Sequence, residues 1–385
     1  MVAAAKSPSV ALVGPVLPYR GGIAQHTTML HRELQRLSRL TTVSFKRQYP
    51  ALLFPGSTDI DPDHRDYREP GVTYTLDSLN PLTWRRVARE LLELKPDLVI
   101  IPWWTVYWAP LTRYLVGRLK RGGIPVLFIC HNVSEHESAA WKNWLARRVL
   151  ARGSHFLTHT AADAGQIRQI VPDADVSVHA HPVYRQFPPP EVPLPRRRGL
   201  ELLFYGFLRP YKGLDILISA MGLLRGRDIQ LTVAGEIWSG GEQILQQIQQ
   251  LGIEGQVELI PRYQSEAETA RLFTRADAVV LPYRSATGSG VVAIAYHYRK
   301  PVIVTDVGGL PEVVREGETG FIVPAGDAPA MAQTIARLDR ESCAGMGLAI
   351  RDLSRGLNWE GMARKILERV TNPPATACTP AGTAR

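Results

Sequence analysis

The most informative stretch of this chain begins with Thr287-Gly288-Ser289-Gly290. An apolar run follows, and then Lys300-Pro301-Val302-Ile303-Val304-Thr305-Asp306-Val307-Gly308-Gly309. This order predicts a glycine-rich turn, a buried helix, a buried strand and a second glycine turn. Backbone N–H groups left unpaired at a helix N-terminus suit an anion, most often a phosphate. The alternative for the turn taken alone is a helix capped by Ser or Thr.

Length and composition indicate a two-domain globular enzyme. The chain has 385 residues, with 45% hydrophobic and 21% charged side chains, which suits two cores of ordinary size. Cys130, Cys343 and Cys378 are widely spaced, which argues against a disulfide framework or structural zinc and for a reducing compartment. The N-terminus lacks a signal-peptide core, and no uninterrupted apolar run of about 18 residues occurs. We therefore expect a protein in the cytoplasm or peripheral on the inner face of the membrane.

Charge is divided unevenly along the chain. Residues 1–198 hold 26 Lys and Arg against 16 Asp and Glu, whereas residues 199–385 hold 19 against 20. A basic first half indicates contact with an anionic surface or ligand. No nucleic-acid-binding motif accompanies the charge, so we expect no nucleic acid partner. An anionic membrane surface or a phosphate-bearing acceptor fits equally well.

Both halves alternate β-rich runs with amphipathic stretches, which predicts parallel sheets covered by helices. We expect a first domain over residues 1–195, a proline-rich linker, and a second domain over residues 199–357. The first domain should contain strands at Ser9–Val13, Asp97–Pro102, Pro125–Cys130, His155–His159 and Val176–His179, helices at Ile23–Leu40 and Leu111–Lys120, and an irregular loop at 48–80.

The second domain should repeat the architecture. Its expected strands are Glu201–Tyr205, Gln230–Ala234, Val257–Ile260, Ala278–Leu281 and Val302–Val304, with helices at Leu214–Leu224, Gln243–Gln250 and Glu266–Thr274. A C-terminal helix at about 358–371 is expected to pack back on the first domain. Residues 372–385 are small and rich in Pro and Thr, which predicts a disordered tail.

In each half of the chain, a glycine-rich loop follows the first predicted strand. Arg20-Gly21-Gly22 precedes the first helix, and Gly206-Phe207-Leu208-Arg209-Pro210-Tyr211-Lys212-Gly213 precedes a helix in the second half. Neither is a P-loop or a dinucleotide-binding fingerprint. A pair of cations beside a helix N-terminus suits two adjacent anions, such as a diphosphate. The alternatives are a tight turn and two solvated surface cations.

An ordered series of motifs then sets the second half apart. After the Arg209 and Lys212 loop come Val233-Ala234-Gly235-Glu236, Ala276-Asp277-Ala278-Val279-Val280-Leu281-Pro282-Tyr283, Val304-Thr305-Asp306-Val307-Gly308-Gly309-Leu310-Pro311-Glu312, Gly317-Glu318-Thr319-Gly320-Phe321-Ile322-Val323 and Pro324-Ala325-Gly326-Asp327. The series resembles the nucleotide-sugar domain of retaining GT-B glycosyltransferases of family four, most strongly over residues 200–330. Arg20-Gly21-Gly22 and Cys130-His131-Asn132 extend the resemblance more weakly into the first half.

The resemblance implies a fold and a set of roles. The fold is α/β, with two Rossmann-like domains facing across a cleft, the acceptor on the first and the nucleotide-sugar donor on the second. Arg209 and Lys212 would bind the donor diphosphate and stabilise its charge as the glycosidic bond breaks, and His131 would lie beside the transferred sugar. The donor-binding set is completed by Gly21, Gly22, Glu236, Arg262, Ser285, Thr287, Gly288, Ser289 and Gly290.

Two departures from the family pattern concern this donor site. The family usually carries two glutamates eight residues apart, where this chain has Ala286 and Ile294. Its loop arginine usually lies five residues before the lysine, where this chain has Phe207, and Arg209 is only three before. We therefore expect Ser285, Thr287, Ser289 and backbone amides to take over the sugar contacts.

We expect neither a metal nor a cofactor, because Arg, Lys and a helix dipole replace the metal in such enzymes. The Asp61/Asp63 and Asp173/Asp175 pairs are therefore interpreted as loop acids. His131 and His136 lie near Glu135 and Glu137, and such a group could suggest a metal site. Their spacing is not that of the HExxH motif, so we do not expect a metal there.

Aromatic and basic residues gather in two places in the first half. Trp103 and Trp104 lie in one loop, and Trp141, Trp144, Arg147 and Arg148 lie in a basic stretch. Aromatic rings with cations suit a membrane interface. The alternative is a core-facing helix with a solvated basic side. We favour a peripheral membrane enzyme that uses a lipid-linked hydroxyl acceptor in cell-envelope synthesis.

Two other functions stay open at this point. A non-catalytic subunit that binds a nucleotide sugar or a partner is supported by Ala286 and Ile294, and opposed by the retained Arg209, Lys212 and His131. A nucleotide-sugar epimerase of the same fold would need carboxylates around the sugar, which the donor loop lacks.

Overall fold

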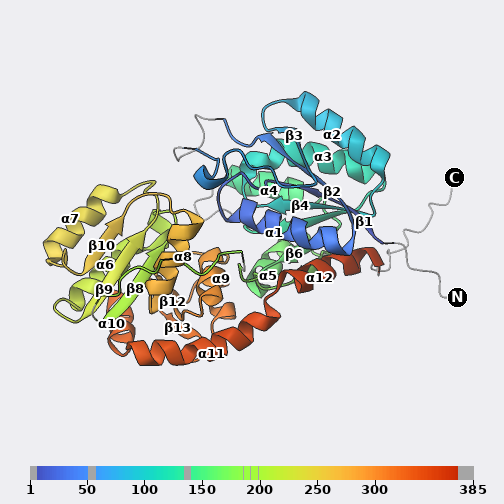
Figure 1. The fold of residues 1–385 in the computed structure, drawn as a ribbon. Helices are drawn as coiled ribbons and strands as arrows, with labels where there is room; N and C mark the ends of the chain where they lie inside the picture. Colours follow the sequence, from blue (N-terminus) through green and yellow to red (C-terminus); the bar gives the residue numbers. More distant parts are fainter. Residues whose placement is uncertain are drawn as a thin grey trace, which may run out of the picture.

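The computed structural model describes residues 7–50, 58–133, 140–184, 186–190, 192–197 and 199–371. These residues form two parallel α/β domains (Figure 1). The predicted tail at 372–385 and His136 lie outside the described residues. Within them, no helix is long and apolar enough to cross a membrane.

The first domain contains a seven-stranded sheet in the order β3-β2-β1-β4-β5-β6-β7. Its strands are β1 Ser9–Val13, β2 Arg39–Arg47, β3 Val72–Asp77, β4 Leu98–Trp103, β5 Val126–Cys130, β6 His155–Thr158 and β7 Asp175–Val178. Its helices are α1 Gly22–Leu37, α2 Pro81–Leu94, α3 Ala109–Arg121, α4 Ala140–Leu150 and α5 Ala161–Ile170, with short 3-10 turns η2 Pro62–His64 and η3 Val106–Trp108.

The second domain contains a six-stranded sheet in the order β10-β9-β8-β11-β12-β13. Its strands are β8 Leu200–Tyr205, β9 Ile229–Ala234, β10 Val257–Ile260, β11 Ala278–Leu281, β12 Val302–Thr305 and β13 Gly320–Val323. Its helices are α6 Leu214–Leu223, α7 Gly241–Leu251, α8 Glu266–Arg275, α9 Gly290–His297, α10 Ala328–Ala336 and α11 Arg340–Gly356, with 3-10 turns η4 Pro210–Lys212 and η5 Pro311–Val313.

The final helix, α12 Trp359–Thr371, returns to the first domain. It leaves the end of α11 and lies against α1 (Figure 1). Met362 and Ile366 are fully buried in a core cluster that also contains Leu30 of α1. Burying each of these side chains contributes about 1.5–3 kcal/mol to the stability of the fold. α12 therefore joins the two domains by packing as well as by covalent linkage.

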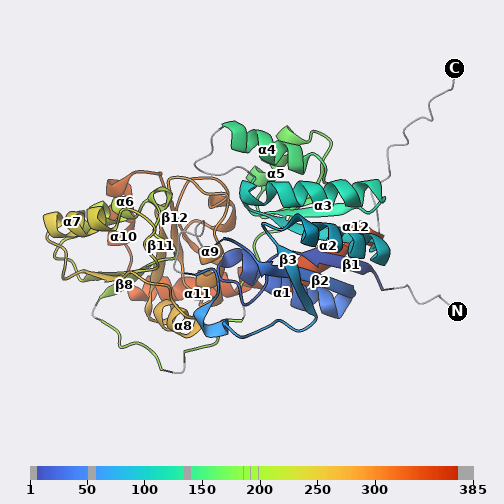
Figure 2. The same cartoon turned by 90° about the horizontal axis from the view of Figure 1, so that it is seen from above.

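The alternation of buried residues along the first sheet explains its two helical layers. Successive residues of β1 and β4 belong to different core clusters, because strand side chains point to opposite faces. One face packs on α1 and α12, and the other packs on α2, α3 and α4, which lie together on one side (Figure 2).

Two predictions for the first domain were wrong. The first helix ends at Leu37 rather than Leu40, since β2 begins at Arg39. The expected loop at 48–80 contains β3, and α2 follows directly. β3 is an edge strand with the sequence Val-Thr-Tyr-Thr-Leu-Asp. Its β-branched and aromatic residues favour a strand, but the surrounding Pro, Asp and Gly residues led us to predict a loop.

In both sheets the strand order reverses beside the domain's first strand. In the first sheet β1 lies between β2 and β4, and in the second sheet β8 lies between β9 and β11. Ligands of open parallel sheets bind at such switch points, outside the carboxyl ends of the strands. The two glycine-rich loops of the sequence follow β1 and β8, so both occupy a switch point.

Candidate active site between the domains

A cleft of about 740 Å³ lies between the two domains. Most of the residues predicted for a donor site line it: Gly21, Gly22, Arg209, Lys212, Glu236, Thr287, Gly288, Ser289 and Gly290. Trp104 lines it as well. The cleft therefore brings together two glycine turns and a cationic loop that lie far apart in the sequence.

Lys212 is a buried cation at the base of this cleft. It ends the 3-10 turn η4, directly before the Gly213 that begins α6, and is 8% exposed. Burial, together with the neighbouring Arg209, lowers the pKa of Lys212 from 10.5 to about 7. No side chain caps the N-terminus of α6, so its dipole and Lys212 favour an anion at the same place.

Gly206 allows this lysine to lie against the backbone. It follows β8 with a φ of 103°, and a Cβ added there would lie 2.8 Å from Nζ of Lys212. Only glycine combines the positive φ with this close approach.

Arg209 is the second cation of the same loop and is exposed to solvent. Its guanidinium lies 4.0 Å from the centroid of the Trp238 ring, and the Phe207 ring lies 4.5 Å from that ring. The sequence analysis missed Trp238, because a single tryptophan after β9 carries no motif. The stack fixes the direction of Arg209 toward the cleft lined by all three residues.

The 287–290 stretch forms another part of the cleft wall. Ser289 caps α9, its side chain accepting from the N–H of Val291 at 3.2 Å. The hydroxyl of Thr287 lies 2.7 Å from Oδ1 of Asn132 and 3.0 Å from the carbonyl oxygen of His131. The turn is thus a serine-capped helix start that also lines the cleft, and Thr287 ties it to the first domain.

The second glycine turn supports this donor wall from behind. Gly308 has a φ of 53°, and a Cβ there would lie 1.6 Å from the carbonyl oxygen of Ala286. The N–H of Gly309 donates to the carbonyl oxygen of Thr287 at 3.1 Å. The two glycine turns of the opening stretch therefore contact each other, and the second holds the first in place.

Ala286 and Ile294 both line the cleft and are 9% and 6% exposed. At the positions where the family usually carries glutamates, this chain presents apolar side chains. Neither can form a hydrogen bond with a sugar hydroxyl.

The first-domain wall contains Gly21 and Gly22 at the start of α1. A Cβ added to either residue would meet no protein atom within 4 Å, so a ligand can approach the backbone there closely. No side chain caps α1. Beside them, Arg20 donates to Oε2 of Glu236 at 2.8 Å across the domain boundary, with side chains only 1% and 17% exposed. Arg20 was missed as a site residue, although it adjoins the predicted glycines.

Three of the residues predicted for catalysis or donor binding do not line the cleft. Ser285 is half-buried beside it. Arg262 is exposed and donates to both carboxylate oxygens of Glu268. The Nε2 atom of His131 is buried among other histidine rings.

The residues predicted to contact a membrane or an acceptor divide between core and surface. The prediction for Trp103 was wrong, since this last residue of β4 is 2% exposed and packs on Phe128. Trp141 and Trp144 of α4 are 60% and 53% exposed. Arg147 and Arg148 are exposed on the same helix, and the Arg148 guanidinium lies 4.4 Å from the Trp144 ring.

One aspartate of each predicted pair has partners within the protein. Asp61 is buried and accepts from the hydroxyl of Tyr263 at 3.1 Å. Asp175 pairs with His155 at 2.9 Å and with Arg369 at 3.0 Å. The contacts described here give these acids structural partners.

Comparison with known proteins follows the same division into two domains. A family model described as Glycosyltransferase Family 4 matches residues 20–205, and one described as Glycosyl transferases group 1 matches residues 199–340. Two curated proteins named D-inositol 3-phosphate glycosyltransferase, from Arthrobacter sp. and Streptomyces scabiei, are 29% and 28% identical over 57% and 66% of this chain. The chain spans 53% and 64% of the length of these two relatives.

Solved structures share the fold at low identity. Sucrose-phosphate synthase from Thermosynechococcus elongatus has a TM-score of 0.71 at 18% identity, covering 93% of this chain and 97% of that chain. Anabaena HepE in complex with UDP has a TM-score of 0.68 at 18% identity, covering 94% and 99%. The architecture is therefore GT-B, two Rossmann-like domains facing across a cleft.

Proposed function

Because this chain belongs to glycosyltransferase family 4, we propose that it moves a sugar from a nucleoside-diphosphate sugar to a hydroxyl acceptor with retention of configuration. The observation that carries the proposal is the placement of Lys212 and Arg209 beside the N-terminus of α6, in a cleft bounded by both domains. Two cations and a helix dipole suit a diphosphate.

The proposed chemistry follows from the charge that develops on the donor. As the bond between the sugar C1 and the phosphate oxygen breaks, the departing nucleoside diphosphate gains negative charge. Lys212 and Arg209 stabilise that charge as it develops. The acceptor oxygen forms the new bond to C1 on the same face, and its proton passes to an oxygen of the departing phosphate. This proposal needs neither a protein base nor a metal at the diphosphate.

The sugar contacts must differ from those usual in the family. Ala286 and Ile294 leave the donor wall apolar where carboxylates are usual. We propose that Ser289 and the backbone amides of the 287–290 turn take over part of this binding. The HepE structures hold UDP and UDP-glucose, so a UDP-sugar is the first donor to test.

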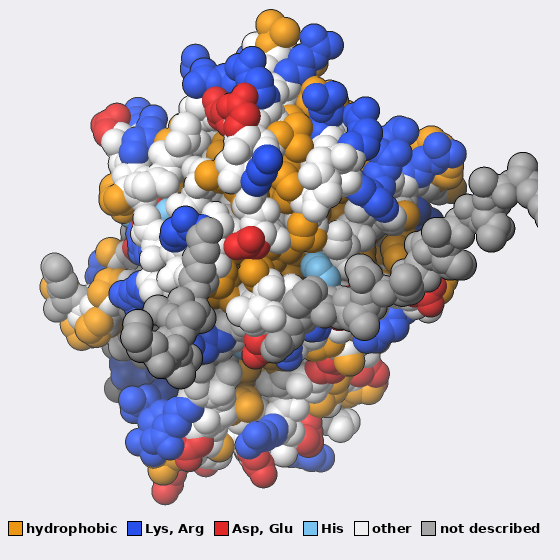
Figure 3. Space-filling view, turned by 90° about the vertical axis from the view of Figure 1, so that its right-hand side faces the viewer, with side chains coloured by type: hydrophobic (Ala, Val, Ile, Leu, Met, Phe, Trp, Pro, Cys, Tyr) orange, Lys and Arg blue, Asp and Glu red, His pale blue; other side chains and the backbone are white. Residues whose placement is uncertain are grey.

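The acceptor is proposed to be phosphate-bearing or lipid-linked, in the synthesis of envelope polysaccharide, lipopolysaccharide or glycolipid. α2, α3 and α4 carry exposed Lys and Arg side chains. Figure 3 shows that Lys and Arg side chains crowd the upper part of the face it displays. Trp141 and Trp144 stand exposed on α4. Aromatic rings among cations suit the headgroup region of an anionic membrane, so we propose peripheral attachment of this face.

Attachment is testable by flotation with vesicles containing anionic phospholipid at low salt. The wild type should float, and a Trp141→Ser/Trp144→Ser double variant should float less. Leu348→Ser offers a control, because Leu348 is 61% exposed and lies on α11 of the second domain. A wild type that stays unbound at low salt would contradict the membrane proposal.

A second function, a non-catalytic subunit that binds a nucleotide sugar, is favoured by Ala286 and Ile294. One experiment separates the two. The protein is incubated with UDP- and GDP-sugars, with and without inositol phosphate or polyprenyl-phosphate-linked acceptors, and nucleotide release is measured with EDTA present. Release that rises with acceptor supports the transferase, and binding without release supports the subunit. Neither binding nor release across the panel would overturn both.

A further inference from the structure

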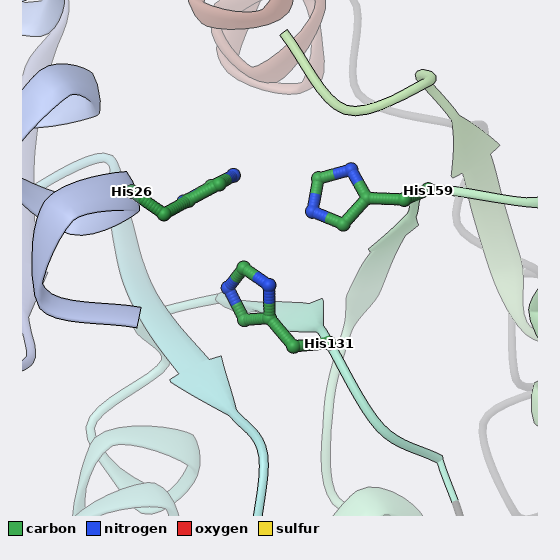
Figure 4. Close-up of side chains that lie close together, drawn as sticks. All are labelled: His26, His131 and His159. Carbon is green, nitrogen blue, oxygen red and sulfur yellow. The ribbon is translucent and has the colours of Figure 1, made fainter. Parts of the chain in front are cut away.

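Four histidine rings gather at the carboxyl edge of the first sheet. His26 belongs to α1, His131 directly follows β5, His159 directly follows β6, and His181 lies beyond β7. The ring centroids of His26 and His131 are 4.5 Å apart, and His159 lies 5.1 Å from each. One nitrogen from each of these three rings lies within 4.8 Å of the other two, and the three rings face a common space (Figure 4).

The nitrogens facing this space lack hydrogen-bond partners among the described residues. His26 is fully buried, and neither of its ring nitrogens has a partner. The Nε2 atoms of His131 and His159 are also buried without one. A buried polar atom without a partner costs about 1–3 kcal/mol, and one such nitrogen on each of the three rings calls for a ligand that satisfies the three together.

The tautomer of His159 is set by its other nitrogen. Nδ1 of His159 lies 2.9 Å from the carbonyl oxygen of His179. Since a carbonyl only accepts, Nδ1 carries the proton and Nε2 presents a lone pair to the common space. A histidine that binds a metal through one ring nitrogen usually donates a hydrogen bond from the other nitrogen, often to a backbone carbonyl.

We propose that His26, His131 and His159 together bind one divalent transition-metal ion of the zinc class. Neutral imidazoles are ordinary ligands of zinc, with Zn–N distances of about 2.0–2.1 Å, which place tetrahedral nitrogens about 3.3 Å apart. The three nitrogens close to that spacing by small rotations of the rings, and the fourth position takes a water molecule. No carboxylate or thiol is needed.

This site is separate from the proposed diphosphate site and does not rest on the proposed function. None of the three histidines lines the cleft. The ion joins α1 to the ends of β5 and β6, and the carbonyl oxygen of His131 accepts from Thr287. Its role is therefore to stiffen the first-domain edge on which the donor turn rests. The sequence analysis expected no metal, because Arg, Lys and a helix dipole replace it at the donor site. Ligands from three distant positions form no spacing motif that would have indicated this second site.

The first test uses full-length wild-type protein without a histidine tag, stripped with chelator and titrated with Co²⁺ and Zn²⁺. We expect one equivalent of tightly bound ion, the visible absorption of tetrahedral Co²⁺, and an X-ray absorption spectrum of the zinc form with three imidazole nitrogens at about 2.0–2.1 Å. Failure to bind either ion stoichiometrically, or a ligand shell without imidazole, would overturn the proposal.

The second test uses variants. His26→Gln and His159→Gln should each weaken Zn²⁺ affinity by at least 100-fold and abolish the rise in Tm that Zn²⁺ gives the wild type. His179→Gln is the matched control: it removes a neighbouring imidazole but keeps the carbonyl that orients His159, so it should bind Zn²⁺ as the wild type does. Wild-type affinity in both ligand variants would refute the site. If either variant fails to fold, the wild-type absorption spectrum decides.

Discussion

Lys212→Met should make the protein more stable while nearly abolishing activity. Lys212 is 8% exposed and its pKa falls from 10.5 to about 7, with burial as the main cause. The unfolded chain therefore binds more protons between pH 7 and 10.5, and stability rises with pH across that window. At about 1.4 kcal/mol per pKa unit, the buried lysine destabilises the protein at pH 7 by an amount on the order of 4 kcal/mol.

The same substitution removes a charge aimed at the leaving group. Losing one preorganised electrostatic donor costs about 2.7–4 kcal/mol of transition-state stabilisation, or about 10²–10³ in kcat. Tm at pH 7 should therefore rise by several degrees while nucleotide release falls. The gain in stability should shrink as the pH rises toward 10.5.

Two measurements complete the test. Calorimetric titration of the wild type with UDP at pH 8, in buffers of different ionisation enthalpy, should detect proton uptake as Lys212 becomes charged, and Lys212→Met should lose that uptake. Lys300→Met is the control, because Lys300 is a second lysine whose pKa burial lowers but which lies outside the cleft lining; its turnover should match the wild type. Unchanged turnover in Lys212→Met, or activity lost together with a lower Tm, would refute the reasoning.

Three further predictions concern the walls of the cleft. Gly308→Ala should lower Tm by more than Gly317→Ala does, and it should weaken UDP binding. Both glycines have a positive φ, but only at Gly308 would an added Cβ clash with a backbone atom. Equal effects of the two substitutions on Tm and on UDP binding would contradict this prediction. Thr287→Val removes an interdomain hydrogen bond, which should cost about 0.5–1.5 kcal/mol of transition-state stabilisation. We therefore expect kcat/KM to fall about 2–10-fold, and an unchanged kcat/KM would count against this prediction. Arg20→Met should remove the buried ion pair with Glu236, lowering Tm and increasing proteolytic cleavage between the domains, whereas Glu236→Gln with wild-type Tm would show that the pair contributes nothing.

The sequence predicted the fold well where hydrophobic runs are continuous. β1 and β11 begin and end where expected, because strands buried on both faces read as unbroken apolar segments. β3 was missed because it lies at the sheet edge, where only part of its surface is buried. Edge strands depend on pairing with a neighbour, and no local pattern records that pairing.

The candidate site was predictable where glycine and cation fall in one short loop. Gly206, Arg209 and Lys212 are close in sequence, so their meeting in the cleft required no knowledge of the rest of the fold. Trp238 and the cluster of His26, His131 and His159 could not be predicted in this way. Each depends on residues from separate elements that only the packing of the strands brings together.

The contacts that join the domains also help to form the donor site. Thr287 donates across the boundary to the 131–132 loop, Arg20 donates to Glu236, and Glu312 accepts from the first N–H groups of α5. Of these residues, Thr287, Arg20 and Glu236 line the cleft. A donor that contacts them must bind the closed and open arrangements with different affinity, so donor binding and domain closure are thermodynamically linked. Weakening one of these links should therefore weaken donor binding even where the altered side chain never touches the nucleotide.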